Sequence, residues 1–232
     1  MNISHLNPKT ILFSFSEVKN YVDSVINSGQ KRIIVTLNTE MFVDSIYDSE
    51  FKEIIDNFAV VLESVGICHL FWKKNRVKVE PINGIDLAEK LISDGYRVFI
   101  LGAKKENLDR AVQNLSSLYL RSSIVGYHHG YFEDDAFVID QINRVSPSIL
   151  LVGMGSPRQE KWIYRNMDRL NFNIGIGIGG SIDVWSGFVR RAPELFRKAK
   201  LEWMYRTLSD FKRIPRLKKL IKFALMTAMG RI

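Results

Sequence analysis

The stretch from Ile149 to Trp162 combines residue types that can bind an anion. An apolar run ends in a glycine turn that contains Gly155. Ser156, followed three residues later by Gln159, is the pattern of a capping box, and Pro157 is favoured at the first position of a helix. We therefore expect a helix to begin just past a strand, with N–H groups that favour a diphosphate. An ordinary strand-to-helix turn without a ligand fits the same residues, so both interpretations stay open here.

A second candidate for chemistry is Glu63, which directly follows the short apolar run Val60–Leu62. We predict that this run is a strand of a parallel sheet, so that Glu63 lies at the carboxyl edge, where ligands bind in α/β proteins. A solvated loop residue is the competing interpretation. Asp86, together with Glu89, is better explained as the cap of a helix that ends at Gly95.

The segment Ile174–Gly180 satisfies the spacing G-x-G-x-x-G of dinucleotide-binding turns. Those turns follow the first strand of a βαβ unit and open an apolar helix, whereas these glycines alternate with isoleucine late in the chain. We interpret the segment as a strand whose glycine face lets a ligand or another backbone come close. A nicotinamide-dependent oxidoreductase would have to bind its cofactor near Gly175, and the missing fingerprint after the first strand counts against it.

The side chains that bind metals show no suitable spacing. The chain has a single cysteine, Cys68, and the adjacent His128 and His129 cannot point the same way on a strand. Glu133–Asp135 resembles the acidic cluster with which some sugar-nucleotide enzymes hold a divalent ion. It directly precedes the expected helix Ala136–Arg144, however, and acids are favoured at a helix N-terminus. We therefore expect neither a metal nor a cofactor.

The elements that must position these residues are strands alternating with helices. Branched apolar runs predict strands, and a helix from Glu40 to Phe58 is expected after a cap at Asn38 or Thr39. A loop rich in aromatic residues is expected at Gly126–Phe132. The alternation predicts an α/β fold with a mostly parallel sheet covered by helices. The other expected strands are Ile33–Leu37, Val98–Leu101, Ser123–Val125 and Ile149–Val152.

Composition limits the class of protein. With 232 residues, of which 46% are hydrophobic and 25% charged, the chain is a folded protein of one large domain with room for a small appendage. One cysteine indicates a reducing compartment. We expect no signal peptide and no membrane-spanning helix, because no sufficiently long apolar run occurs.

The positive charge is concentrated at the C-terminus. The formal net charge is +8, and the segment Phe196–Ile232 holds eleven Lys and Arg residues against Glu202 and Asp210, so the rest is nearly neutral. From Ile214 onward, apolar residues recur every three or four positions, which predicts an amphipathic basic helix for an anionic membrane surface. Packing on the protein's own core is the competing interpretation. Nucleic acid is not an expected partner, because no nucleic-acid-binding motif accompanies the charge.

Three separated blocks of sequence resemble one known family. In chain order they are TLNTE (Thr36–Glu40), GMGSPRQEKW (Gly153–Trp162), and RAP (Arg191–Pro193) with LEWMYR (Leu201–Arg206). On these blocks the chain resembles the WecG/TagA/CpsF glycosyltransferases, family 26 of the carbohydrate-enzyme classification. The resemblance extends from about Arg32 to Arg216, and its second and third blocks are specific.

The resemblance implies a bacterial, inverting glycosyltransferase without a bound metal. Such an enzyme moves glucose, N-acetylmannosamine or its uronic acid from a UDP donor to a polyprenyl-diphosphate-linked sugar, for a wall polymer, capsule or other surface polysaccharide. It further implies a Rossmann-like catalytic domain, here residues 1–193, and a C-terminal appendage, residues 194–232, that completes the site at the membrane. The implied location is peripheral, at the cytoplasmic face of the cell membrane.

The resemblance also assigns roles to residues. Glu63 stands where the family has its catalytic base, and Thr36 and Asn38 are expected to line the pocket around it. Arg206, Arg213 and Arg216 match arginines that the family uses near the diphosphates. The turn at Gly179 is expected to flank the donor. The residues expected to bind substrate are Gly155, Ser156, Pro157, Gln159, Gly179, Gly180, Asp183, Arg191, Arg206, Arg213 and Arg216.

Two departures from the family pattern bear on activity. Glu63-Ser64 stands where the family has Asp followed by Gly, and Pro81 stands where an Arg precedes a Gly-x-Asp segment. The expected base has therefore gained a methylene, which leaves it competent but changes its reach. A catalytically inactive relative that binds lipid-linked sugar is the alternative to an enzyme. The oligomeric state stays open, although a face exposed by a moving tail would favour a homo-oligomer.

Overall fold

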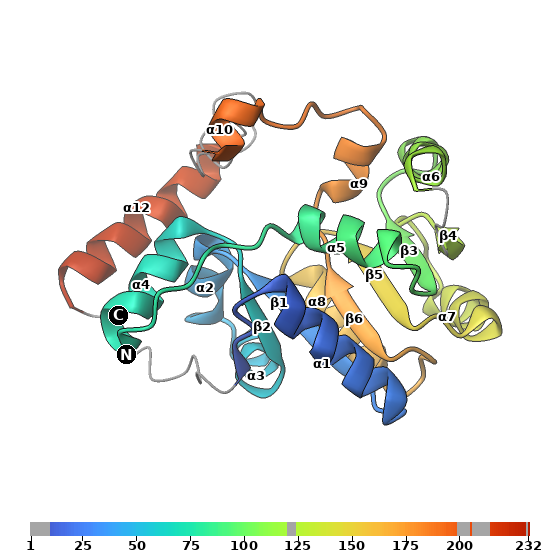
Figure 1. Ribbon diagram of the computed structural model, residues 1–232, viewed down its shortest axis with the longest axis horizontal. Coiled ribbons are helices and arrows are strands. Elements are labelled where there is room, and N and C mark those ends of the chain that lie inside the picture. The colour runs from blue at the N-terminus through green and yellow to red at the C-terminus, as the bar shows by residue number, and fades with distance from the viewer. Residues whose placement is uncertain (1–9, 120–123, 199–204, 206–213, 231) are drawn as a thin grey trace.

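The computed structural model describes residues 10–119, 124–198, 205, 214–230 and 232. In this part of the chain, six parallel strands form one sheet in the order β2-β1-β6-β5-β3-β4 (Figure 1). The expected parallel sheet is thus confirmed. Its strands are β1 (Arg32–Leu37), β2 (Ala59–Leu62), β3 (Val98–Gly102), β4 (Ile124–His128), β5 (Ile149–Gly153) and β6 (Ile174–Gly177).

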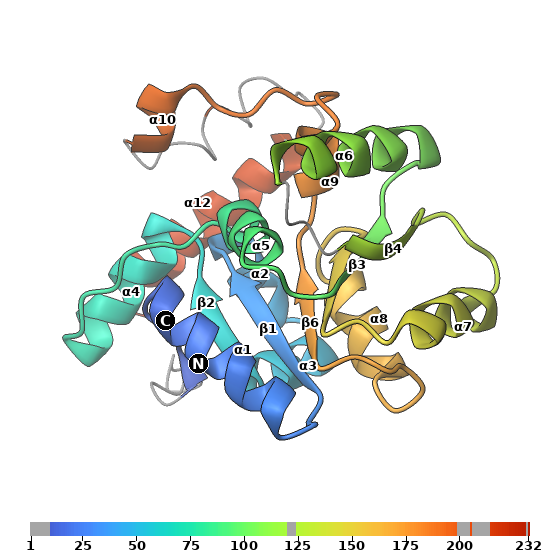
Figure 2. The same ribbon diagram turned by 45° about the vertical axis from the view of Figure 1, so that its right-hand side comes forward.

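Helices cover both faces of this sheet (Figures 1 and 2). Each face has its own cluster of buried apolar side chains. The first face packs against α2 (Thr39–Ser45), α3 (Ser49–Asn57), α4 (Val65–Asn75), α7 (Asp135–Val145) and α8 (Arg158–Asn166). The second packs against α1 (Phe15–Asn27), α5 (Gly84–Ser93), α6 (Lys105–Leu118) and α9 (Ser181–Trp185). The expected Rossmann-like α/β fold is therefore confirmed.

Branched apolar side chains build the central strands. Ile33–Val35 in β1 have no exposed surface, as expected for a parallel strand covered on both faces. In the register of β1 with β2, Leu37 lies opposite Leu62, and the N–H of Glu63 donates to the carbonyl of Leu37 at 2.8 Å. The residues that follow β1 and β2 therefore leave the sheet side by side at its carboxyl edge.

The helix expected from Glu40 to Phe58 is two helices, α2 and α3. They are separated near Tyr47, and Asp48 caps α3 by accepting the N–H of Phe51 at 3.0 Å. An internal capping residue thus divides a segment whose apolar periodicity alone suggested one continuous helix.

The segment expected as an aromatic loop begins as a strand. β4 continues to His128, which pairs with Leu101 of β3, so only the residues after His128 form the loop. Asp134 accepts the N–H of Ala136 at 2.8 Å and caps α7. The acidic residues Glu133–Asp135 therefore serve the start of the helix, as expected.

In the described part of the C-terminal tail, α9 is followed by α10 (Glu194–Lys198) and α12 (Ile214–Ala228). The amphipathic helix expected from Ile214 is thus present, and α12 packs against α2. The ring of Phe223 meets that of Phe42 edge-on at 6.0 Å between centroids, and Nζ of Lys219 lies 2.6 Å from Oδ1 of Asp44. One side of the helix therefore contacts the body, and the division into domains 1–193 and 194–232 stays a prediction.

The segment from Glu194 to Lys212 also has the residue spacing of a helix, but only its first residues are described as one, α10, and most of the remainder lies outside the described residues. Among the helices that are described, none has both the length and the apolar character needed to cross a membrane.

Candidate active site

Glu63 lies just past β2 and is held at both carboxylate oxygens. Nδ2 of Asn38 donates to Oε2 at 3.4 Å, and the N–H of Gly84 donates to Oε1 at 3.2 Å. The side chain is half-buried. Two donors from different elements fix the direction of this carboxylate, which suits it to take a proton from a positioned substrate.

Asn38 supports Glu63 from the end of β1. Its Oδ1 accepts the N–H groups of Glu40 and Met41 at 3.0 Å each, so Asn38 is the cap of α2, as expected. The cap fixes the side chain of Asn38 so that its amide group points at Glu63. The asparagine therefore links the start of a helix to the candidate base.

Thr36 supports the same region from inside β1. Its buried hydroxyl donates to the carbonyl of Gly177 at 3.1 Å, which joins β1 to β6. The side chain also packs against Gly84, where an added Cβ would lie only 3.3 Å from Oγ1 of Thr36. Thr36 thus sets the position of the backbone N–H that reaches Glu63.

The turn after β5 differs from the expected capping box. Pro157 occupies the cap position of α8. The buried Ser156 hydroxyl does not cap the helix but lies near the Glu160 carboxyl, where it offsets part of the effect of burial on the pKa. Gln159 turns back, and its Oε1 accepts the N–H of Gly155 at 3.1 Å. The same oxygen accepts the N–H of Gly179, in the turn after β6, at 3.1 Å. A contact between two turns therefore replaces the local cap.

Glu160 lies beside Gln159 and has no exposed surface. Its Oε1 accepts Nε2 of Gln159 at 2.7 Å. Burial raises the pKa of the Glu160 carboxyl above its ordinary value, and the Gln159 amide offsets part of this rise. Sequence reasoning missed this residue because a glutamate in the first turn of a helix looks like a solvated acid. Its place in the GMGSPRQEKW block was the available signal.

The glycine face of β6 is filled by side chains of α8. A Cβ at Gly177 would overlap Gln159 and Glu160, and a Cβ at Gly175 would overlap Ile163. The expectation that a ligand or another backbone approaches this face is therefore wrong. The missing side chains make room for a helix, whose buried polar groups lie against the strand.

The turn after β6 leads to Asp183 in α9. Nδ2 of Asn107 in α6 donates to Oδ1 of Asp183 at 2.7 Å, which joins α9 to α6. At Gly179, φ is 51°, and its N–H is the one bound by Gln159. At Gly180 nothing lies within 4 Å of an added Cβ. The expected donor-flanking residues thus lie between the Gln159 turn and the start of α6.

Asp86 does not cap α5 as expected. Asn83 occupies the cap position, and Asp86 lies in the first turn, where it forms an ion pair with Arg191. Nη1 of Arg191 also lies 3.9 Å from Oε2 of Glu89. A partner distant in sequence therefore takes the place of the local cap. The pair fastens the segment after α9 to α5, and it commits Arg191 to contacts within the protein.

The tail arginines are only partly placed. Arg206 and Arg213 lie outside the described residues, and only the backbone of Arg216, in the first turn of α12, is described. Their expected contact with diphosphates stays a prediction. In the described part of the chain, no three His, Cys, Asp or Glu side chains form a group that could hold a metal ion.

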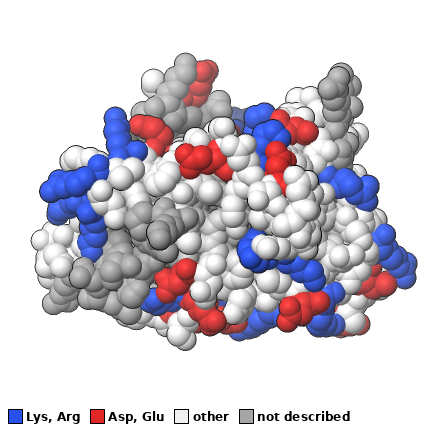
Figure 3. Space-filling view, turned by 60° about the horizontal axis from the view of Figure 1, so that its bottom comes forward, with Lys and Arg blue, Asp and Glu red and all other residues white. Residues whose placement is uncertain are grey.

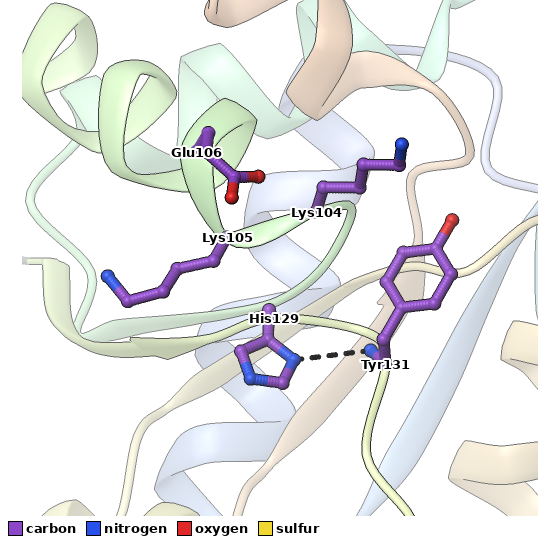
Figure 4. Close-up of a pocket in the computed structure, with 5 residues that line it drawn as sticks. All are labelled: Lys104, Lys105, Glu106, His129 and Tyr131. Atoms are coloured by element: carbon purple, nitrogen blue, oxygen red, sulfur yellow. Dashed lines mark hydrogen bonds between the residues drawn. The ribbon is translucent and has the colours of Figure 1, made fainter.

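A pocket of about 310 Å³ lies where β3 and β4 end (Figure 4). Lys104 and Tyr131 extend in the same direction in Figure 4, whereas Lys105 extends to the other side. Lys105 pairs with Asp109 at 2.7 Å. The lining residues are Lys104, Lys105, Glu106, His129 and Tyr131.

The backbone around this pocket suits an anion. The cap residue of α6, Lys104, accepts no hydrogen bond with its side chain. The N–H groups of the first turn of α6, which begins at the pocket, are therefore not capped by it and can bind an anion. The N–H of Gly130 donates to the carbonyl of Ala103 at 2.9 Å, which brings the loop after β4 to the start of α6. Sequence reasoning missed the pocket because its two loops are distant in sequence. Gly102-Ala103-Lys104 after a predicted strand was the available signal.

The glycosyl transferase WecG/TagA/CpsF family has a sequence model that matches residues 5–232. Two related proteins are both named N-acetylglucosaminyldiphosphoundecaprenol N-acetyl-beta-D-mannosaminyltransferase. The protein from Bacillus subtilis (strain 168) is 31% identical over 229 residues, which cover 97% of this chain and 88% of the relative. The protein from Staphylococcus aureus (strain MW2) is 31% identical over 217 residues, which cover 91% and 84%. The similarity therefore includes the whole carboxyl edge of the sheet.

Proposed function

The chain belongs to the WecG/TagA/CpsF family of glycosyl transferases, and on this premise we propose that it moves a sugar from a UDP donor to a polyprenyl-diphosphate-linked sugar with inversion. The names of both relatives specify N-acetylglucosaminyl-diphosphoundecaprenol as acceptor and N-acetylmannosamine as the transferred sugar. This acceptor and UDP-N-acetylmannosamine are therefore the first substrates to test. The observation that carries the proposal is the Glu63 carboxylate, held at the sheet edge by Asn38 and Gly84.

Glu63 is the general base of the proposed reaction. It takes the proton of the acceptor hydroxyl, and the hydroxyl oxygen forms a bond to the anomeric carbon of the donor sugar. The bond from that carbon to the diphosphate breaks, and its electron pair leaves with UDP. Attack opposite the leaving group inverts the configuration. The two N–H donors on Glu63 support this role, because a misplacement of about 1 Å can cost ~100-fold in rate.

We place the UDP of the donor in the pocket at the ends of β3 and β4. The donor diphosphate is an anion, and cations and the N–H groups at the start of a helix bind such a group. Lys104 and the start of α6 supply both kinds of group. The ring of Tyr131 is suited to stack on the uracil. The Asn107–Asp183 hydrogen bond joins α9, which follows the Gly179 turn, to the first turn of α6 at this pocket, and it therefore supports this location for the donor.

A catalytically inactive relative that binds lipid-linked sugar is the second candidate. Glu63 in place of the family Asp favours it, and so does Pro81, which supplies neither a cation nor an N–H group. The variant Glu63→Asp separates the two candidates, because it restores the family residue. An inactive relative would bind UDP, but as the wild type it would release none from a UDP-sugar, and release would appear only in Glu63→Asp. An enzyme would release UDP already as the wild type.

We further propose that α12 docks on an anionic membrane at the cytoplasmic face. Leu217, Ile221 and Leu225 follow one another at one-turn spacing and are 40%, 53% and 55% exposed, whereas Phe223 is buried against the body. In Figure 3, basic side chains predominate at the end of the molecule that carries α4 and α12, and both charges mix over the rest of that face. An apolar stripe beside lysines is typical of an interfacial helix.

Flotation with vesicles tests the docking proposal. The variant Leu225→Asp should lower the fraction bound to anionic vesicles about tenfold. It removes apolar area that would be buried in the membrane on docking, and it adds a negative charge that anionic lipids repel. Leu118→Asp is the matched control, because Leu118 is 72% exposed at the end of α6, far from α12 in Figure 1. Equal flotation of both variants would contradict docking through this stripe.

The activity itself is tested by product mass. The protein is incubated with a panel of UDP-sugars and a short-chain prenyl-diphosphate-linked N-acetylglucosamine, and the lipid product is weighed by mass spectrometry. A product heavier by one sugar, with release of one UDP, is the expected result. Hydrolysis of the UDP-sugar without a lipid product, or no UDP release with any donor, would contradict the transfer.

A further inference from the structure

The Gln159 side chain connects the two turns at the centre of the carboxyl edge. Its Oε1 accepts the N–H of Gly155, after β5, and the N–H of Gly179, after β6, both at 3.1 Å. The side chain is only 2% exposed. Its amide oxygen is therefore used by two backbone groups, and little of the residue is left for contact with a substrate.

Glu160 fixes the other end of this amide. Its Oε1 accepts Nε2 of Gln159 at 2.7 Å, which determines which end of the amide faces the two turns. The Glu160 side chain is fully buried, and the nearby Ser156 hydroxyl also favours the charged form of its carboxyl. Burying a carboxyl group costs free energy of folding, so its presence here indicates a structural or chemical use.

The neighbouring strands leave space for this pair and connect it to the base. Gly177 has no side chain where a Cβ would overlap both Gln159 and Glu160. The carbonyl of Gly177 accepts the Thr36 hydroxyl at 3.1 Å, and Thr36 packs against Gly84, the donor to Glu63. The pair thus lies between the turns that border the donor and the groups that hold the candidate base.

We propose that Gln159 and Glu160 form a clamp that holds the Gly155 and Gly179 turns in one geometry, with Glu160 as the positioning residue that orients Gln159. This inference rests on the proposed function insofar as the two turns border the donor. Gln159 then acts on the donor through the backbone of the turns. For this purpose Glu160 needs only an oxygen that accepts the hydrogen bond from Nε2 of Gln159.

Two substitutions of Glu160 test the clamp in the full-length protein. Glu160→Met keeps an unbranched side chain but removes the acceptor for Gln159, whereas Glu160→Gln keeps an amide oxygen that can accept. In Glu160→Met we expect faster hydrogen exchange at the amides of Gly155 and Gly179, and a Kd for UDP about tenfold higher by calorimetry. The KM for the lipid-linked acceptor should stay within about twofold. Glu160→Gln should resemble the wild type in the exchange of both amides, in the Kd for UDP and in this KM.

Two results would overturn the clamp. One is an unchanged exchange rate of both amides in Glu160→Met. The other is equal impairment of Glu160→Gln and Glu160→Met, which would mean that the carboxyl group itself is required. A wild-type protein that binds no UDP would refute the proposed function instead, and the exchange rates would still decide for or against the clamp.

A pH profile gives an independent readout. Burial raises the pKa of Glu160, so the folded protein holds this proton more tightly than the unfolded chain does. The resulting contribution to stability is present below the ordinary pKa of glutamate and is lost as the pH rises through the folded pKa. The unfolding free energy of the wild type relative to Glu160→Gln should therefore fall as the pH rises above the ordinary pKa of glutamate. A difference that does not change with pH would count against a carboxyl group whose pKa is raised by burial.

Discussion

Polar side chains at the two ends of the sheet's carboxyl edge are held to different degrees. Near β1, β2 and β6, Glu63, Asn38 and Gln159 each make hydrogen bonds with groups of other elements. Near β3 and β4, Tyr131 is 69% exposed, and Lys104 makes no ion pair with any residue that the structure describes. The first region is fixed before a substrate arrives, whereas the second can adjust to one.

This difference indicates that the two regions suit different steps of a transfer reaction. Groups fixed in advance lower the barrier of a chemical step, because they need no reorganisation when charge moves. Side chains that extend into solvent can order around a nucleotide and contribute affinity. Substitution of the candidate base in the fixed region should therefore lower kcat, and substitutions that disturb the packing or the hydrogen bonds of Gln159 and Glu160 should lower stability or donor affinity. Substitutions in the adjustable region should raise the KM for the donor and leave kcat nearly unchanged.

The largest effect is expected for Glu63→Gln. The amide cannot take the proton of the acceptor hydroxyl, so kcat for UDP release should fall about 1000-fold, while the Kd for UDP stays within about twofold. Glu53→Gln is the matched control, because Glu53 bonds to the Tyr164 hydroxyl on an outer helix. Turnover of Glu63→Gln close to that of the wild type would show that Glu63 is not the general base. It would also contradict the assignment of the chemical step to the fixed region.

The second effect concerns stability. Gly177→Ala places a methyl group where it overlaps Gln159 and Glu160, and it should lower the unfolding free energy by about 1–3 kcal/mol. Chemical denaturation measures the change. Gly180→Ala is the control, because nothing lies within 4 Å of a Cβ there and its φ is −86°. Equal stability of the two variants would show that the fixed region is looser than its hydrogen bonds indicate.

The strands of both regions could be predicted from sequence. Runs such as Ile33–Leu37 and Ile149–Val152 are branched and apolar, and each is followed by a capping residue or a glycine, so their burial and their carboxyl ends follow from residue type. The caps at Asn38 and Asp134 could also be predicted, because each bonds to a backbone N–H two or three residues further on. These features depend only on neighbours in the chain.

The side-chain partners inside the site could not be predicted, because they come from distant parts of the chain. Gln159 fits a capping box locally, yet its oxygen bonds to Gly179 twenty residues away. Asp86 fits a cap, yet it pairs with Arg191. The pocket at Lys104 requires β3 and β4 to be neighbours, and strand order is not encoded in local periodicity. Local sequence patterns therefore gave the wrong partner at positions where the actual partner comes from a distant part of the chain.

The smallest effect, and the sharpest test of the comparison, is expected for Lys104→Ala. Removing one cation that binds the donor diphosphate should raise the KM for the UDP-sugar about tenfold and leave kcat within about twofold. Lys105→Ala is the matched control, because Lys105 pairs with Asp109 and extends to the other side of the pocket. Its KM should stay near that of the wild type. If Lys104→Ala instead lowers kcat at unchanged KM, Lys104 acts on the transition state, and the β3–β4 end belongs with Glu63 to the catalytic machinery.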